Sequence, residues 1–147
     1  DLRGEAVLCV GGRNDLDQAC ATMLAQLLRK HGLGVALETP DVLGSAGADR
    51  LRPDVTRLVC LSYLDTSSPV HVRYAVRRIR RRIPDARIVV GSWGLDTPDA
   101  TGLCETVRSD ACASRLIEAT RLCLDAAANA SAPATPEDVA GRRASAA

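Results

Sequence analysis

Three short apolar runs, each followed by a stretch of helical periodicity, constrain the fold of this chain more than any other feature. The runs are Ala6–Val10, Arg57–Ser62 and Arg87–Gly91. Unbroken apolar runs of this length are typical of strands that are buried on both faces of a parallel sheet. Strands that alternate with helices in this way predict right-handed crossovers, with helices on both faces of the sheet.

The strongest helical pattern follows the first run and ends in a basic turn before Gly32. Asp15 or Asp17 is expected to cap its start, because both lie just before the periodic residues. The apolar face of this helix is expected to consist of Cys20, Met23, Leu24, Leu27 and Leu28.

Weaker patterns complete the alternation of strands and helices. A helix is expected from Pro69 until Pro84, with Ser67 or Ser68 as its cap, and a short or irregular helix lies within residues 41–52. The other expected elements are strands at Gly34–Glu38 and Ala111–Ser114, a helix at Thr97–Val107, and a last helix from Leu116 to about Ala128.

These elements predict a flavodoxin-like, doubly wound α/β domain over residues 1–128. Its parallel sheet has five strands in the order 2-1-3-4-5. Residues 129–147 are rich in Ala, Ser and Pro and carry no core-facing pattern, so they are predicted to form a disordered tail.

Charge and cysteine spacing argue against several kinds of partner. The formal net charge is +1, which gives no overall field to attract nucleic acid, and no nucleic acid is expected as a partner. The six cysteines show neither C-x-x-C nor ligand spacing with the two histidines, so no metal site is expected and the thiols are interpreted as small hydrophobes. No oligomeric state is predicted.

A ligand site is expected at the carboxyl ends of the strands, where the strand order reverses between the first and third strands. Three loops meet there: Gly11–Asp17, Ser62–Ser68 and Gly91–Thr97. We expect Ser62 and the loop amides to donate hydrogen bonds to a small polar ligand, with Trp93 as an apolar wall. The candidate ligand-binding residues are Asp15, Asp17, Ser62, Tyr63, Leu64, Gly91, Ser92 and Trp93.

Catalytic and nucleotide-binding patterns are missing from these loops. The first loop lacks the G-x-G-x-x-G spacing of a dinucleotide site, and no nucleophile with a base or paired acid and base can be placed, so we expect no enzyme activity. A phospho-receiver domain shares this topology and is a second alternative function. It is disfavoured because Asp65 lies well beyond the end of the third strand and no Lys follows the fifth.

The three loops together resemble the cobalamin-binding domain. That family carries D-x-H-x-x-G in the first loop, S-x-L or S-x-T after the third strand, and a G-G pair after the fourth. The matching residues are Asp15, Ser62, Leu64 and Gly91. Asp17 stands where the family has its cobalt-ligating His, Cys20 replaces a glycine, and Trp93 could fill the channel for the nucleotide tail. No cofactor is therefore expected, and a cobalamin- or corrinoid-binding regulator without His ligation is the alternative function.

Four longer phrases resemble the C-terminal cytosolic extension of some bacterial permeases of the autoinducer-2 exporter family. They are VLCVGGRNDLDQACATMLAQLLRKHGLG, LVCLSYLD, VRYAVRRIRRRIPDARIVVGSW and DACASRLIEA. The resemblance implies a non-catalytic sensory or regulatory domain at the cytoplasmic face of the bacterial inner membrane. Its partner would be the membrane-spanning part of the same chain, which we expect to precede Asp1, since the sequence does not begin with Met.

The helix after Pro69 is unusually rich in arginine. An amphipathic helix of this kind can bind anionic lipid headgroups, although a simply solvated face is the simpler interpretation. The candidate membrane or partner surface consists of Arg73, Arg77, Arg78 and Arg81.

Overall fold

The structure is a computed structural model that describes residues 6–64, 68–94 and 97–131. It contains a five-stranded parallel sheet in the order β2-β1-β3-β4-β5, as the sequence predicts. Each end of each strand falls within one residue of its predicted run. The strands are β1 (Val7–Gly11), β2 (Val35–Glu38), β3 (Leu58–Tyr63), β4 (Arg87–Ser92) and β5 (Ala111–Ala113).

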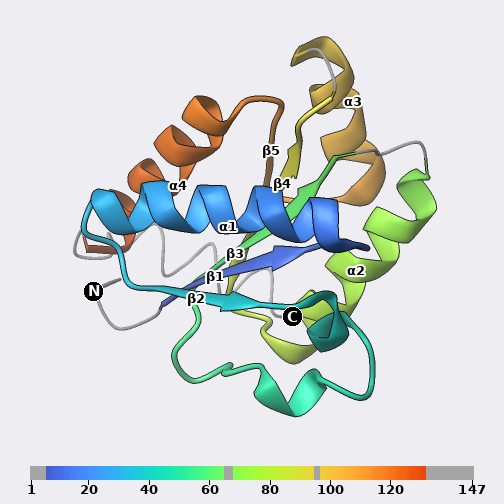
Figure 1. Ribbon diagram of the computed structural model, residues 1–147, viewed down its shortest axis with the longest axis horizontal. Coiled ribbons are helices and arrows are strands. Elements are labelled where there is room, and N and C mark those ends of the chain that lie inside the picture. Colours follow the sequence, from blue (N-terminus) through green and yellow to red (C-terminus); the bar gives the residue numbers. More distant parts are fainter. Residues whose placement is uncertain (1–5, 65–67, 95–96, 132–147) are drawn as a thin grey trace, which may run out of the picture.

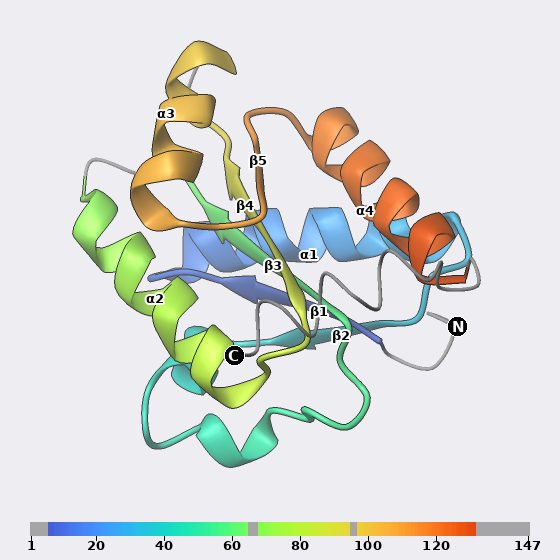
Figure 2. The same cartoon turned by 180° about the vertical axis from the view of Figure 1, so that it is seen from behind.

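Helices cover both faces of the sheet, with α1 and α4 on one face and α2 and α3 on the other (Figures 1 and 2). Between β2 and β3 lie two short 3-10 helices, η1 (Pro40–Leu43) and η2 (Ala48–Arg50), which confirms the irregular helix predicted there. The α-helices are α1 (Asp15–Lys30), α2 (Pro69–Arg82), α3 (Thr97–Val107) and α4 (Leu116–Ser131).

Two helix boundaries differ from the predictions. Ser68 occupies the cap position of α2, but its side chain makes no capping hydrogen bond, and Ser67 lies outside the described residues. The last helix continues past Ala128 to Ser131. The remainder of the predicted tail, residues 132–147, also lies outside the described residues. Within the described part of the chain, no helix is both long and apolar enough to cross a membrane.

The strands alternate their side chains between two aliphatic cores. Val10, Val59 and Leu61 face α2 and α3, whereas Cys9 and Cys60 face α1 and α4. This alternation follows from the two-residue repeat of a strand and explains why the runs are apolar throughout. One prediction for α1 was wrong: Met23 is 47% exposed. The buried face of α1 includes small residues in place of Met23. It consists of Asp17, Cys20, Ala21, Leu24, Ala25 and Leu28.

Three buried thiols meet at the centre of the core under α1 and α4. Cys9 and Cys60 are paired in register on β1 and β3, and the sulfur of Cys60 lies 3.4 Å from that of Cys123 on α4. All three are at most 1% exposed. Contacts with the thiols of Cys123 and Cys9, together with burial, raise the pKa of Cys60 well above its ordinary value. The thiols fill the core as small neutral groups, as expected.

Raising the pH above about 9 is expected to lower the free energy of unfolding. The Cys60 thiol stays protonated in the folded protein, whereas in the unfolded chain it ionises near its ordinary value of 9.0. Above that value the loss approaches about 1.4 kcal/mol per pH unit for this group. Urea unfolding from about pH 8 to about pH 11 measures the slope, which should become shallower in Cys60→Ala. An unchanged slope in that variant would contradict the assignment.

Candidate functional site

The loop after β1 begins α1 with an asparagine cap. Asn14 has extended backbone angles, and its Oδ1 accepts a hydrogen bond from the amide of Asp17 at 3.0 Å. The prediction that Asp15 or Asp17 caps α1 was therefore wrong. Asn and Asp are about equally good capping residues, so Asn14, Asp15 and Asp17 were all suitable by residue type. In the structure the first of them, Asn14, is the cap. Asp15 is exposed in the first turn of the helix.

Asp17 instead ties two loops together at the carboxyl edge of the sheet. Its side chain is buried, and its Oδ2 accepts from the amide of Arg13 at 3.0 Å. Its Oδ1 accepts from the amide of Leu64 at 2.7 Å, in the loop that follows β3. Both carboxylate oxygens therefore bind backbone N–H groups, and the contact joins the two loops at the point where the strand order reverses.

Two further loop amides at this edge also donate hydrogen bonds within the chain. The amide of Gly12 donates to the carbonyl of Ser62 at 2.9 Å, and the amide of Trp93 donates to the carbonyl of Tyr63 at 3.1 Å. These bonds extend the ladders between neighbouring strands by one residue. The amides of Gly12, Arg13, Leu64 and Trp93 are therefore already paired within the chain, and the prediction that loop amides donate to a ligand does not hold for these four.

Two glycines allow aromatic rings to pack directly on the sheet backbone at this edge. A Cβ atom at Gly12 would overlap the Tyr63 ring, and one at Gly91 would overlap the Trp93 indole. Tyr63 packs in the core under α2 and α3, where its ring also meets His71 edge-on with centroids 6.4 Å apart. Trp93 packs against the core under α1 and α4. Trp93, which was predicted to form an apolar wall of the site, therefore packs over Gly91.

Three buried polar atoms at this edge have no hydrogen-bond partner within the described part of the chain. They are Ser62 Oγ, Tyr63 OH and Trp93 Nε1. Burial raises the pKa of Tyr63 well above its ordinary value, the negative charge of Asp17 raises it further, and the positive charge of Arg13 opposes this shift. The Tyr63 hydroxyl is therefore a neutral, desolvated group close enough to both charged side chains to sense them.

An open hollow of about 230 Å³ lies in front of the first loop. Leu16 is 63% exposed and Leu64 is 44% exposed, so two large apolar side chains border it beside polar groups. The hollow is lined by Arg13, Asn14, Leu16, Asp17 and Leu64. Such a surface suits a ligand with both an apolar body and polar substituents.

The predicted site residues fall into three groups in the structure. Asp17 and Leu64 line the hollow. Ser62, Tyr63, Gly91, Ser92 and Trp93 lie at the ends of β3 and β4 but do not line the hollow, and all but the partly exposed Trp93 are buried. Asp15 is exposed to solvent, and residues 65–67 and 95–96 of the two later loops lie outside the described residues.

Sequence reasoning missed three residues that line the hollow: Arg13, Asn14 and Leu16. Leu16 lies between Asp15 and Asp17, outside the buried face of α1. A large apolar residue at such a position could have indicated a binding surface. Metal chemistry finds no support either. Among the described residues, no group of three His, Cys, Asp or Glu side chains could hold a metal ion.

Comparison with known proteins supports the fold. The sequence matches no protein-family model and no curated protein. A solved structure that does match is the 1.5 Å crystal structure of a novel cobalamin-binding protein from Desulfitobacterium hafniense DCB-2, with a TM-score of 0.64 and 18% sequence identity. The match covers 85% of this chain and 59% of the other, so this chain spans about three fifths of that protein's length.

At this level of identity the likeness establishes the α/β fold and its strand order. The flavodoxin-like topology and the similarity in fold to a cobalamin-binding protein are both confirmed. The resemblance to autoinducer-2 exporter permeases gains no support from these comparisons and stays a prediction.

Replacing Asp17 is expected to destabilise the fold because two partly buried backbone N–H groups lose their acceptor. Asp17→Ala should lower the free energy of unfolding by about 3 kcal/mol, and Asp17→Asn, which keeps one acceptor oxygen, by about 1–2 kcal/mol. Asp15→Ala serves as the matched control in the same helical turn, with a change below about 1 kcal/mol. Urea unfolding measures all three; equal midpoints for Asp17→Ala and Asp15→Ala would contradict the role of Asp17.

Proposed function

We propose that this chain is a non-catalytic binding module that holds a small polar ligand at the carboxyl edge of its sheet. The observation that supports this most directly is the set of unpartnered buried atoms, Ser62 Oγ, Tyr63 OH and Trp93 Nε1. Ser62 and Tyr63 end β3 and Trp93 directly follows β4, and buried polar groups in native proteins are nearly always paired. Ligand groups that reach this edge would supply the missing partners.

The hollow in front of Asp17 supports the same location. The charges of Asp17 and Arg13 both act on the Tyr63 hydroxyl, and both residues line the hollow. A polar group entering between Leu16 and Leu64 would therefore meet the same two charges that act on the buried hydroxyl. The two leucines would cover the apolar part of the ligand, while the buried atoms would fix its orientation.

We propose a non-catalytic role because the Asp17 carboxylate is already bound to backbone amides. Asp17 is the buried carboxylate among the described residues, and both of its oxygens accept backbone hydrogen bonds. A general base needs a lone pair directed at the substrate proton, and here the lone pairs hold the loops. A phospho-receiver role gains no support, because β3 ends at Tyr63 with a buried aromatic ring where an acceptor carboxylate would be required.

Within this proposal the module acts as the sensory or regulatory part of a membrane permease, at the cytoplasmic face of the membrane. The four phrases quoted above support this role, and ligand occupancy at the carboxyl edge would be the signal. The reading frame upstream of Asp1 tests it: several membrane-spanning helices there support the permease, whereas a DNA-binding helix-turn-helix favours a different kind of regulator.

Native mass spectrometry of protein purified without denaturation is expected to detect a small molecule bound one to one. Tyr63→Phe should lose it, since the variant removes one orienting hydroxyl, while Tyr74→Phe on the exposed face of α2 should retain it. In the ligand-free protein, Tyr63→Phe should raise the free energy of unfolding by about 1 kcal/mol, because an unpaired buried hydroxyl is removed. Identical spectra for the two variants would contradict the site.

A corrinoid is the second candidate ligand, because the fold is shared with a cobalamin-binding protein. The residues do not fit cobalamin that is held through a protein imidazole with its tail buried. Asp17 stands in the imidazole position with both oxygens bound to amides, and the Trp93 ring covers Gly91. A corrinoid would instead have to lie outside the sheet edge, against Leu16 and Leu64.

Titration with hydroxocobalamin and dicyanocobinamide tests this second candidate. We expect both to be retained in gel filtration with similar affinity and little change in absorption, since neither the tail nor a cobalt ligand is used. Leu64→Glu should abolish retention, and Val70→Glu, at a residue that is 78% exposed on α2, should not. Failure to retain either compound removes the corrinoid, whereas a small molecule seen by native mass spectrometry would still support the first proposal.

A further inference from the structure

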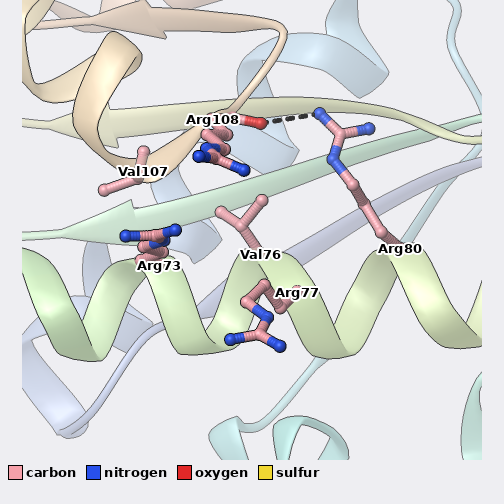
Figure 3. A pocket seen from close by; sticks show the side chains of 6 residues that line it. All are labelled: Arg73, Val76, Arg77, Arg80, Val107 and Arg108. Atoms are coloured by element: carbon pink, nitrogen blue, oxygen red, sulfur yellow. Dashed lines mark hydrogen bonds between the residues drawn. The ribbon is translucent and has the colours of Figure 1, made fainter.

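A second hollow lies between α2 and the end of α3, and four of its six lining residues are arginines. Its volume is about 370 Å³. Figure 3 shows the side chains of Arg73, Arg80 and Arg108 arranged around Val76, with Arg77 on the outer side. We call this hollow the arginine groove; it is lined by Arg73, Val76, Arg77, Arg80, Val107 and Arg108.

Helical spacing and a buried floor hold the arginine groove in place. Arg73, Arg77 and Arg80 are four and three residues apart on α2, so they project from one side of the helix. Val76 and Val107, which are at most 1% exposed, form the floor between the two helices. Three of the guanidinium groups therefore project from α2, and that of Arg108 projects from the turn directly after α3.

Only one of the four guanidinium groups has a partner among the described residues. Arg80 donates to the carbonyl of Arg108 at 2.8 Å and to Asp110 Oδ2 at 3.3 Å (Figure 3). Within the described part of the chain, no hydrogen bond or ion pair engages the side chains of Arg73, Arg77 or Arg108. Three positive charges thus border one hollow without an ion-pair partner among the described residues.

Arg108 occupies a backbone conformation that favours glycine. Its φ is +59°, in the left-handed region, directly after the last residue of α3. Helices commonly end this way, but the residue at that position is usually Gly or Asn. An arginine there costs conformational energy, and such outliers concentrate at functional sites. The placement of the Arg108 guanidinium over the groove is a gain that glycine could not provide.

The arginine groove divides the surface that the sequence predicts as one patch. Arg73 and Arg77 belong to it, whereas Arg78 packs over the Tyr74 ring, 5.5 Å from its centroid, and donates to the Tyr74 hydroxyl at 2.7 Å. Arg81 lines a smaller hollow of about 120 Å³ with Tyr74, Arg77 and Arg78. The larger of the two hollows therefore lies on the side of α2 that faces α3.

We propose that the arginine groove binds a phosphate group, carried by a small soluble molecule or by a lipid headgroup. Guanidinium groups match phosphate oxygens in paired hydrogen bonds, and Arg73, Arg77 and Arg108 approach from two different elements. Binding would neutralise the three unpaired charges. The site is separate from the carboxyl edge, so it holds whether or not the function proposed above is correct.

Calorimetric titration with sodium pyrophosphate at low salt tests the groove. Arg73→Ala and Arg108→Gly should each weaken binding by about tenfold. Arg121→Ala is the matched control, since this arginine is exposed on α4 across the sheet and its loss changes the net charge equally. Arg108→Gly should keep or raise the melting temperature, because glycine suits the left-handed backbone, so lost binding in that variant is not a folding defect.

A parallel arm uses phosphatidylcholine vesicles with and without phosphatidylglycerol. Pyrophosphate binding that depends on Arg73 and Arg108 supports the groove and assigns it to soluble phosphates. Binding only to phosphatidylglycerol vesicles, with the same dependence, supports the groove and assigns it to a lipid headgroup. Absence of binding in both arms, or an equal loss in Arg121→Ala, overturns the proposal.

Discussion

The carboxylate of Asp17 is the interaction on which the carboxyl edge of this domain depends. It accepts from the Arg13 amide and from the Leu64 amide at 2.7 Å, so one buried side chain joins the loops that follow β1 and β3. These loops lie where the strand order reverses, the place where doubly wound sheets open a crevice. Here the crevice is closed at its base by the chain itself. Any ligand must therefore bind in front of Asp17 rather than in its place.

Aromatic rings close the same edge from behind, and glycines make this possible. Tyr63 fills the space over Gly12 and Trp93 fills the space over Gly91, with each ring in a different core. The rings bury apolar area but leave a hydroxyl and an indole N–H without hydrogen-bond partners among the described residues. The fold shared with a cobalamin-binding protein thus carries a differently filled edge, and fold alone does not define what it binds.

The sequence predicted the sheet well because each buried strand satisfies a strong local rule. A run that is apolar on both faces, such as Arg57–Ser62, has few alternatives to a central parallel strand. The site was predicted in location but not in detail. Whether Asn14 or Asp17 caps α1, and whether the Leu64 amide is free, depends on contacts between residues far apart in sequence. Similarly, the Arg108 carbonyl meets Arg80 across 28 positions, and no local pattern encodes that.

The two proposed sites draw their binding energy from different sources. At the carboxyl edge, buried polar atoms are already desolvated, so a ligand gains full hydrogen bonds there and added salt has little effect. In the arginine groove the charges are largely exposed, and their attraction for a phosphate is screened over about 10 Å at 0.1 M salt. A ligand of the edge would also have to match buried polar atoms in fixed positions, whereas the groove would accept many phosphorylated molecules. In these two proposals, selectivity would come from the edge, and the groove would contribute charge-dependent affinity.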